Sequence, residues 1–80
     1  MFTVTTLHRN SADIVQWLQE NIGPVLHCQP IIFWHGEKWH MRNYHTVDTK
    51  NPANNRSGWS IEINDDSLKD KMLLFKIKFG

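Results

Sequence analysis

The chain has 80 residues, a formal net charge of +1 and an apolar content of 40%. A chain of this length forms one small domain, placed here over residues 1–80, which buries only about 60% of the surface that its unfolded form exposes. The small charge gives no electrostatic argument for binding nucleic acid or a membrane surface. No apolar run in the sequence approaches the ~20 residues of a membrane span. Because the single cysteine, Cys28, fits a reducing compartment, we expect a cytoplasmic protein with no membrane partner.

The first third of the chain predicts a strand followed by a helix. Residues 2–6 alternate apolar and hydroxyl side chains, as a half-buried strand does. Ser11 is a suitable N-cap, and apolar residues then recur at three- and four-residue spacing, which predicts an amphipathic helix over 11–22. Gly23 occupies the position at which a left-handed residue commonly ends a helix. On the apolar side of this helix we expect Trp17 to anchor the core.

The stretch 30–44 is rich in apolar and aromatic residues and predicts a β-hairpin. A type II′ turn at Gly36 and Glu37 would put the glycine where a positive φ is needed. In that register Trp34 lies opposite Trp39. The other opposed pairs are Ile32 with Met41, Phe33 with His40, and Ile31 with Arg42.

Successive side chains of a strand point to opposite faces, so the predicted hairpin has two distinct faces. The apolar face, expected to join the core, holds Ile32, Trp34, Trp39 and Met41. The outer face holds Ile31, Phe33, His35, His40, Arg42 and Tyr44. The outer face mixes aromatic, basic and histidine side chains, and it is where we expect function.

The remaining segments complete the predicted fold. The sequence predicts extended chain over 25–29 and a long loop over the polar segment 45–57. It predicts a strand with one solvent-exposed face over 59–63. The end of the chain is ambiguous, because Leu68, Met72, Phe75 and Phe79 recur at helical spacing while Phe75, Ile77 and Phe79 also alternate as in a strand. We divide it into a short helix over 66–73 and a terminal strand over 74–79. In that strand the buried residues would be Phe75, Ile77 and Phe79, and the exposed ones Lys76 and Lys78. The order β-α-β-β-β-α-β indicates an α+β domain, with a mostly antiparallel sheet and helices packed on one face.

Four short stretches of the chain form a recognisable series: WLQENIGP at 17–24, GEKWHM at 36–41, WSIEI at 59–63 and MLLFKIKFG at 72–80. Together they resemble small uncharacterised proteins encoded by tailed phages of marine cyanobacteria. Such proteins often have a helix ending in Gly-Pro, a Gly-x-x-Trp hairpin, and a short acidic helix running into a terminal Phe-x-Leu-x-Phe/Trp strand. Here Ile77 replaces the usual Leu. The resemblance implies a viral origin and carries no activity or site residue.

The histidines and the cysteine are the residues from which a metal site or a catalytic nucleophile could be built. In the predicted register His35 and His40 share a face diagonally, whereas His45 falls on the opposite face, so we expect no metal and no cofactor. Cys28 and His27 are neighbours that would point apart in an extended segment. The sequence also has no glycine-rich phosphate loop, and we expect that the protein is not an enzyme.

These observations favour a small accessory protein that binds another protein, from host or phage, through the outer hairpin face or the loop 46–57. The expected contact residues are His35, His40, Arg42 and Tyr44, since Tyr and Arg are frequent interface hot spots. The alternative is a weak single-stranded nucleic-acid-binding module that uses Lys38, Arg42, Tyr44 and Arg56. The low net charge favours the protein partner. The sequence leaves open a homo-oligomer in which a second copy covers this face.

Overall fold

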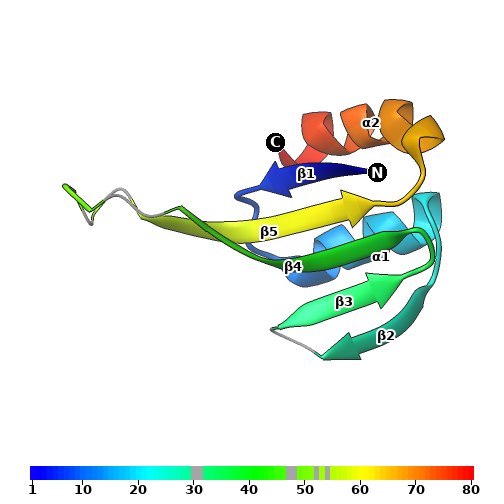
Figure 1. Cartoon of the computed structure of the whole chain (residues 1–80), viewed down its shortest axis with the longest axis horizontal. Coiled ribbons are helices and arrows are strands. Elements are labelled where there is room, and N and C mark those ends of the chain that lie inside the picture. The colour runs from blue at the N-terminus through cyan, green and yellow to red at the C-terminus, as the bar shows by residue number, and fades with distance from the viewer. Residues whose placement is uncertain (30–31, 47–48, 52, 54) are drawn as a thin grey trace.

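The computed structural model describes residues 1–29, 32–46, 49–51, 53 and 55–80 of the chain. Its elements are β1 (Phe2–Thr6), α1 (Ser11–Asn21), β2 (Val25–Gln29), β3 (Phe33–Gly36), β4 (Trp39–Thr46), β5 (Arg56–Ile63), the 3₁₀ turn η2 (Asp66–Leu68) and α2 (Lys69–Phe79). Among the described residues the strands form one antiparallel sheet in the order β1-β5-β4-β3-β2 (Figure 1). The predicted α+β class is therefore confirmed, and the segment 25–29 is a full strand of the sheet.

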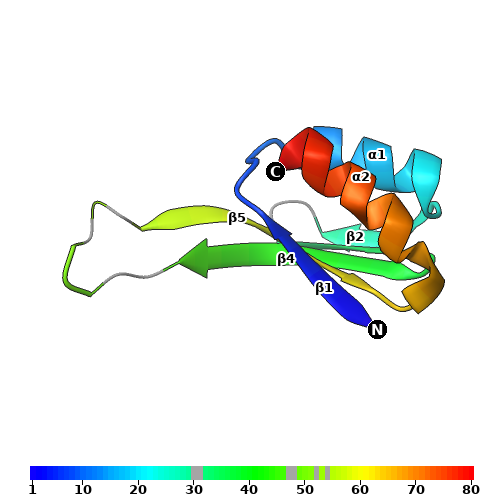
Figure 2. The same ribbon diagram turned by 90° about the horizontal axis from the view of Figure 1, so that it is seen from above.

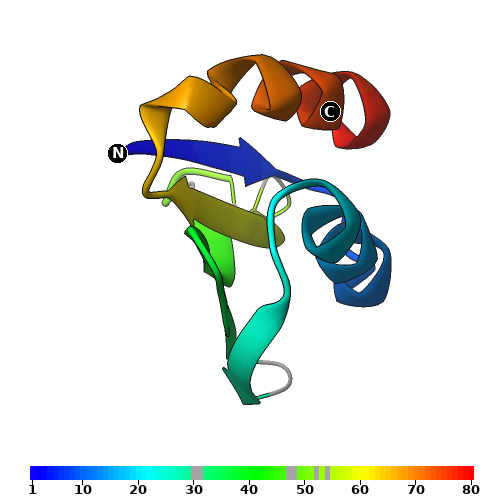
Figure 3. The same ribbon diagram turned by 90° about the vertical axis from the view of Figure 1, so that its right-hand side faces the viewer.

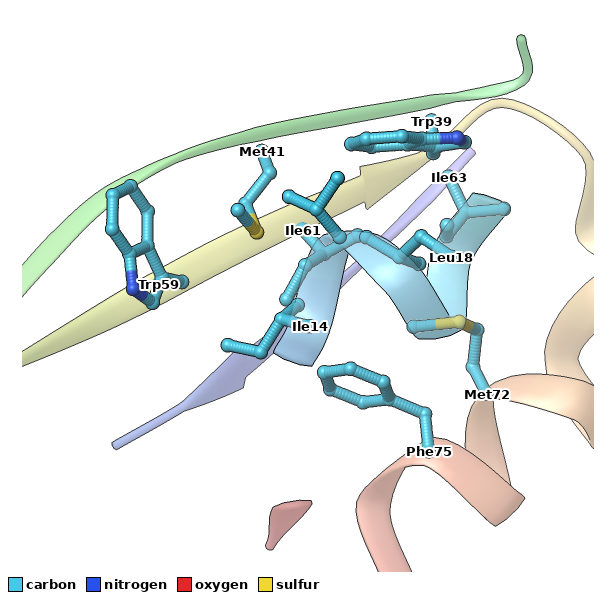
Figure 4. Close-up of a cluster of buried hydrophobic side chains, with 10 residues drawn as sticks. Ile14, Leu18, Trp39, Met41, Trp59, Ile61, Ile63, Met72 and Phe75 are labelled. Carbon is cyan, nitrogen blue, oxygen red and sulfur yellow. The ribbon is translucent and has the colours of Figure 1, made fainter. Parts of the chain in front are cut away.

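The core lies between one face of the sheet and the two helices of the described chain, α1 and α2, which share that face (Figures 2 and 3). Figure 4 shows side chains from β4 and β5 meeting those of the helices. The buried apolar residues are Ile14, Val15, Leu18, Trp39, Met41, Trp59, Ile61, Ile63, Met72 and Phe75. Burial of these side chains is the main force that holds the layers together.

Helix α1 begins and ends differently from the prediction. Asn10, rather than Ser11, is the N-cap, because its Oδ1 atom accepts hydrogen bonds from the backbone N–H groups of the first turn. At the other end Gly23 has no positive φ, so its predicted left-handed conformation is wrong. Gly23 instead provides space, since a Cβ there would lie 2.7 Å from the backbone oxygen of Glu37. Trp17 is half-buried and packs edge-on against Phe75, with ring centroids 5.3 Å apart.

The hairpin formed by β3 and β4 turns one residue later than predicted. Its central residues are Glu37 and Lys38, and Lys38, not Gly36, has the positive φ of 69°. The pairing therefore places Gly36 opposite Trp39. Moving the turn by one residue shifts the register of the two strands by two residues. Because side chains alternate between the faces with a period of two, this shift leaves each side chain on its predicted face.

The two-residue shift in register changes which residues are paired. Trp34, rather than Ile32, is opposite Met41. Ile32 precedes β3 and is 51% exposed, so its predicted place in the core is wrong. The predicted pairing of Ile31 lies outside the described residues.

The indole of Trp39 explains why Gly36 lies in the strand rather than in the turn. A Cβ on Gly36 would lie 2.0 Å from Cε2 of this indole, so only glycine leaves room for the ring. The ring is fully buried, and its Nε1–H donates a 2.8 Å hydrogen bond to the carbonyl oxygen of Gly23. Close approach, rather than a positive φ, is therefore what the hairpin requires of Gly36.

The C-terminal segment is a continuous helix, and the predicted strand over 74–79 is wrong. Phe75 is buried and Phe79 is half-buried, but Ile77 is 82% exposed because it lies on the outer side of α2. Both predicted exposed lysines, Lys76 and Lys78, are exposed. The capping residue is Asp65, whose carboxylate accepts hydrogen bonds from the backbone and hydroxyl groups of Ser67 at the start of η2.

Helix α2 covers the outer edge of β1. The Thr6 hydroxyl donates to the carbonyl oxygen of Phe79 at 2.7 Å, and Lys76 Nζ donates to that of Thr5 at 2.6 Å. Covering an edge in this way protects it from pairing with other chains.

The predicted loop 45–57 is too long at both ends. The ladder between β4 and β5 extends to the pair Thr46 and Arg56, and it projects beyond the helices at the left of Figure 1. On the core side of the sheet the rings of Trp34 and Trp59 meet edge-on with centroids 5.2 Å apart.

Because the C-terminal segment is a helix, alanine substitutions at Phe75 and Ile77 should have unequal effects on the free energy of unfolding. Phe75→Ala should lower the free energy of unfolding by about 3–5 kcal/mol, because it removes a buried aromatic ring. Ile77→Ala should change it by less than about 0.5 kcal/mol, because that side chain is exposed. Urea denaturation followed by circular dichroism measures both, and equal, large losses would instead support a terminal strand.

Candidate functional site

The open face of the sheet is the surface opposite the helices, and it holds every predicted contact residue. Strand alternation places Phe33, His35, His40, Arg42 and Tyr44 together there. His35 and Arg42 are exposed, whereas Phe33, His40 and Tyr44 are half-buried. Figure 3 shows that α1 and α2 lie on the other side of the sheet. We call these five residues the open-face cluster.

The rings of this face contact one another across β2, β3 and β4. Phe33 stacks on His40 with an interplanar angle of 4° and centroids 6.1 Å apart. The ring of Phe33 also meets that of His27 of β2, with centroids 5.6 Å apart. His35 and His40 meet edge-on at 5.5 Å. The rings of His27, Phe33, His35 and His40 therefore form a continuous patch, and Arg42 and Tyr44 follow on the same face of β4.

A β-bulge in β2 brings His27 into this patch. Val25 is opposite Gly36, yet His27 is opposite His35, so β2 contains one extra residue between these pairs. A bulge of this kind changes the face to which the following side chains point. Sequence reasoning did not include His27 in the site, because no residue pattern in 25–29 marks the position of the bulge.

One row of directly opposed residues crosses the sheet through the histidine pair. His27 of β2 is opposite His35 of β3, which is opposite His40 of β4, which is opposite Glu62 of β5. Glu62 is half-buried and brings a carboxylate to the same face. Arg42 lies two residues along β4, so the face carries charges of both signs.

The basic residues of the nucleic-acid alternative do not gather in one place. Lys38 lies at the hairpin turn, where its Nζ is 3.4 Å from the Asp65 carboxylate. A hydrogen bond from the Ser67 hydroxyl is the main cause of the lowered pKa of Asp65, with a smaller effect from Lys38. Arg56 pairs at the far end of β4, roughly 25 Å away at ~3.4 Å per strand residue. Arg42 and Tyr44 lie between these ends.

Two further surface features were not predicted. A shallow groove of about 620 Å³ is lined by Leu7, Arg9, His45, Thr46, Asn55, Arg56 and Ser57. On the outer side of α2, Leu73, Leu74 and Ile77 are 63%, 61% and 82% exposed. We call these three residues the α2 apolar patch. The prediction of a terminal strand hid the patch, although helical spacing of the inward-facing residues was visible in the sequence.

The described part of the chain also limits the chemistry available. Within it, no three or more His, Cys, Asp or Glu side chains are grouped closely enough to hold a metal ion. The Cys28 thiol is exposed on β2. None of the described helices has the length and apolar character needed to cross a lipid bilayer.

Comparison of the chain with protein-family models, with curated proteins and with solved structures gave no match.

The hairpin register, which sets the histidine pairing, predicts opposite effects of glycine at the two turn positions. Lys38→Gly should raise the free energy of unfolding by about 0.5–1 kcal/mol, since glycine adopts a positive φ without strain and the exposed ion pair contributes little. Glu37→Gly should lower it by a similar ~0.5–1 kcal/mol, because it only adds freedom to the unfolded chain. Thermal unfolding of both variants measures the difference, and a reversed order would contradict this register.

Proposed function

We propose that this chain is a non-enzymatic accessory protein that binds another protein through the open-face cluster. The partner comes from host or phage, as the resemblance to phage proteins implies. The proposal rests on one observation: both helices of the described chain lie on one face of the sheet, and the open-face cluster lies on the other. A sheet with one uncovered face that carries grouped aromatic side chains offers a ready contact surface.

The residue types of the cluster suit a protein partner. Phe33 and Tyr44 offer aromatic area that is already half-buried, so little side-chain freedom is lost when a partner covers it. Arg42 is exposed beside them and has several donors for hydrogen bonds at an interface. Aromatic and arginine side chains are the types that contribute most to binding energy at interfaces.

The charge balance supports the same conclusion. Glu62 shares the face with Arg42, and Lys38 is engaged with Asp65 at the turn. A phosphate backbone is bound mainly by clustered positive charge, and that clustering is absent among the described residues of this face. A partner with a mixed polar and aromatic surface fits it better.

The proposal predicts that binding depends on the open face and not on other surfaces. The tagged protein would be used to capture and identify a partner from host lysate, and binding of the purified partner would then be measured. The double variant Arg42→Glu with Tyr44→Ala should weaken this binding at least ~10-fold, as loss of hot-spot residues does. Arg9→Glu, which makes the same charge change at the groove, and Ile77→Glu in the α2 apolar patch should bind like the wild type. Loss of binding in either control, with the double variant unaffected, would contradict the proposal.

A salt titration separates the protein partner from single-stranded nucleic acid. Affinity for the protein partner should fall only modestly between low and moderate salt, and a single-stranded oligonucleotide should bind weakly. Phosphate contacts make affinity fall steeply with salt concentration. Tight oligonucleotide binding that fell steeply with salt and was lost in Arg42→Glu would favour the nucleic-acid alternative instead.

A further inference from the structure

The corrected hairpin register brings two imidazole nitrogens together on the open face. His35 of β3 and His40 of β4 are directly opposite each other, and their Nδ1 atoms are 3.2 Å apart. In the predicted register these rings were only diagonal neighbours. Their present separation is that of a hydrogen bond, in which one nitrogen donates and the other accepts.

The same separation matches two ligands of one metal ion. Zinc–nitrogen bonds are about 2.0–2.1 Å long, and two such bonds at a tetrahedral angle place the nitrogens about 3.3 Å apart. Imidazole nitrogens are good ligands for zinc, copper and nickel. We propose that His35 and His40 form a two-nitrogen chelate for a divalent transition-metal ion of this class. This inference goes beyond the proposed function, because it concerns the chain alone and needs no partner protein.

Binding requires a defined protonation state of both rings. Each Nδ1 atom must offer its lone pair to the metal, so each ring carries its remaining proton on Nε2. In the hydrogen-bonded pair of neutral rings, the donor ring carries its proton on Nδ1. When the metal enters, this N–H bond breaks and the same ring takes up a proton from solvent on Nε2, so no net proton is released. The backbone pairing of β3 with β4 is unchanged.

Neighbouring side chains hold the pair in place. Phe33 stacks on the His40 ring with an interplanar angle of 4°, which restricts the orientation of that imidazole. Both histidines project from paired strands rather than from a loop, and ligands on such rigid elements are the better positioned. The two histidine side chains therefore lose little conformational freedom when they bind the metal ion.

The two histidines leave coordination positions for other donors. Glu62, opposite His40, and His27, opposite His35, continue the row on either side. In this arrangement they do not complete a group of three ligands within the described residues, so water fills the remaining positions. Glu62 and His27 have a supporting role, and their removal should weaken binding less than removal of either member of the pair.

A metal titration of the full chain tests the proposal. Calorimetry with Zn²⁺, Ni²⁺ and Cu²⁺ should give one ion per chain, with Cu²⁺ binding tightest as expected for nitrogen ligands. His35→Ala and His40→Ala should each weaken binding by at least ~10-fold, the loss that removal of even an outer-shell partner causes. His45→Ala, an exposed histidine of the same strand, β4, is the matched control and should bind like the wild type.

The location of the ion is tested separately. Sub-stoichiometric Cu²⁺ should broaden the NMR signals of His35 and His40 before those of His8 and His45, and the same spectra show whether each variant is folded. If half-buried His40→Ala fails to fold, the exposed His35→Ala decides the test. The proposal is overturned if the wild type binds none of the three ions, if binding survives His35→Ala unchanged, or if it is lost in His45→Ala. Because no partner is present, a negative result leaves the protein-binding proposal untouched.

Discussion

The packing of the Trp39 indole over Gly36 is the contact on which the arrangement of this small domain depends. The ring takes the space that any side chain at position 36 would need, and its Nε1–H bonds the carbonyl oxygen of Gly23 just beyond α1. Trp39 is also opposite Ile63 of β5, so one buried residue connects the helix end, the hairpin and the centre of the sheet. A buried aromatic ring of this size contributes a large share of the stability of a domain with so small a core.

The register fixed at Trp39 determines what the opposite face presents. With Gly36 under the indole, His35 must lie opposite His40, and Phe33 opposite Arg42. The bulge in β2 then brings His27 beside His35. The surface that we propose for partner binding and for metal binding is thus a consequence of how the core is packed on the other side of the sheet.

The faces of the hairpin could be predicted from the sequence, because a strand alternates with a period of two and a slide of two residues preserves that period. The position of the turn could not be predicted, since Gly36 fits both a turn and a close contact, and only the indole of Trp39 decides between them. The end of the chain was ambiguous for a related reason. Phe75 and Phe79 satisfy helical and strand spacing alike, and only the exposure of Ile77 separates the two. The bulge that added His27 depends on tertiary contacts and leaves no local signal, whereas the α2 apolar patch was missed because residues 74–79 were assigned to a strand.

The register that pairs Gly36 with Trp39 and His35 with His40 can be measured directly by NMR. Residues directly opposite in an antiparallel pair have Cα atoms only about 4.5–5.5 Å apart, close enough for cross-strand contacts between their protons. This register predicts a nuclear Overhauser effect between the Hα protons of His35 and His40, and none between those of Trp34 and Trp39. The reverse result would place the turn at Gly36 and Glu37, separate the two imidazoles, and show that this register is wrong.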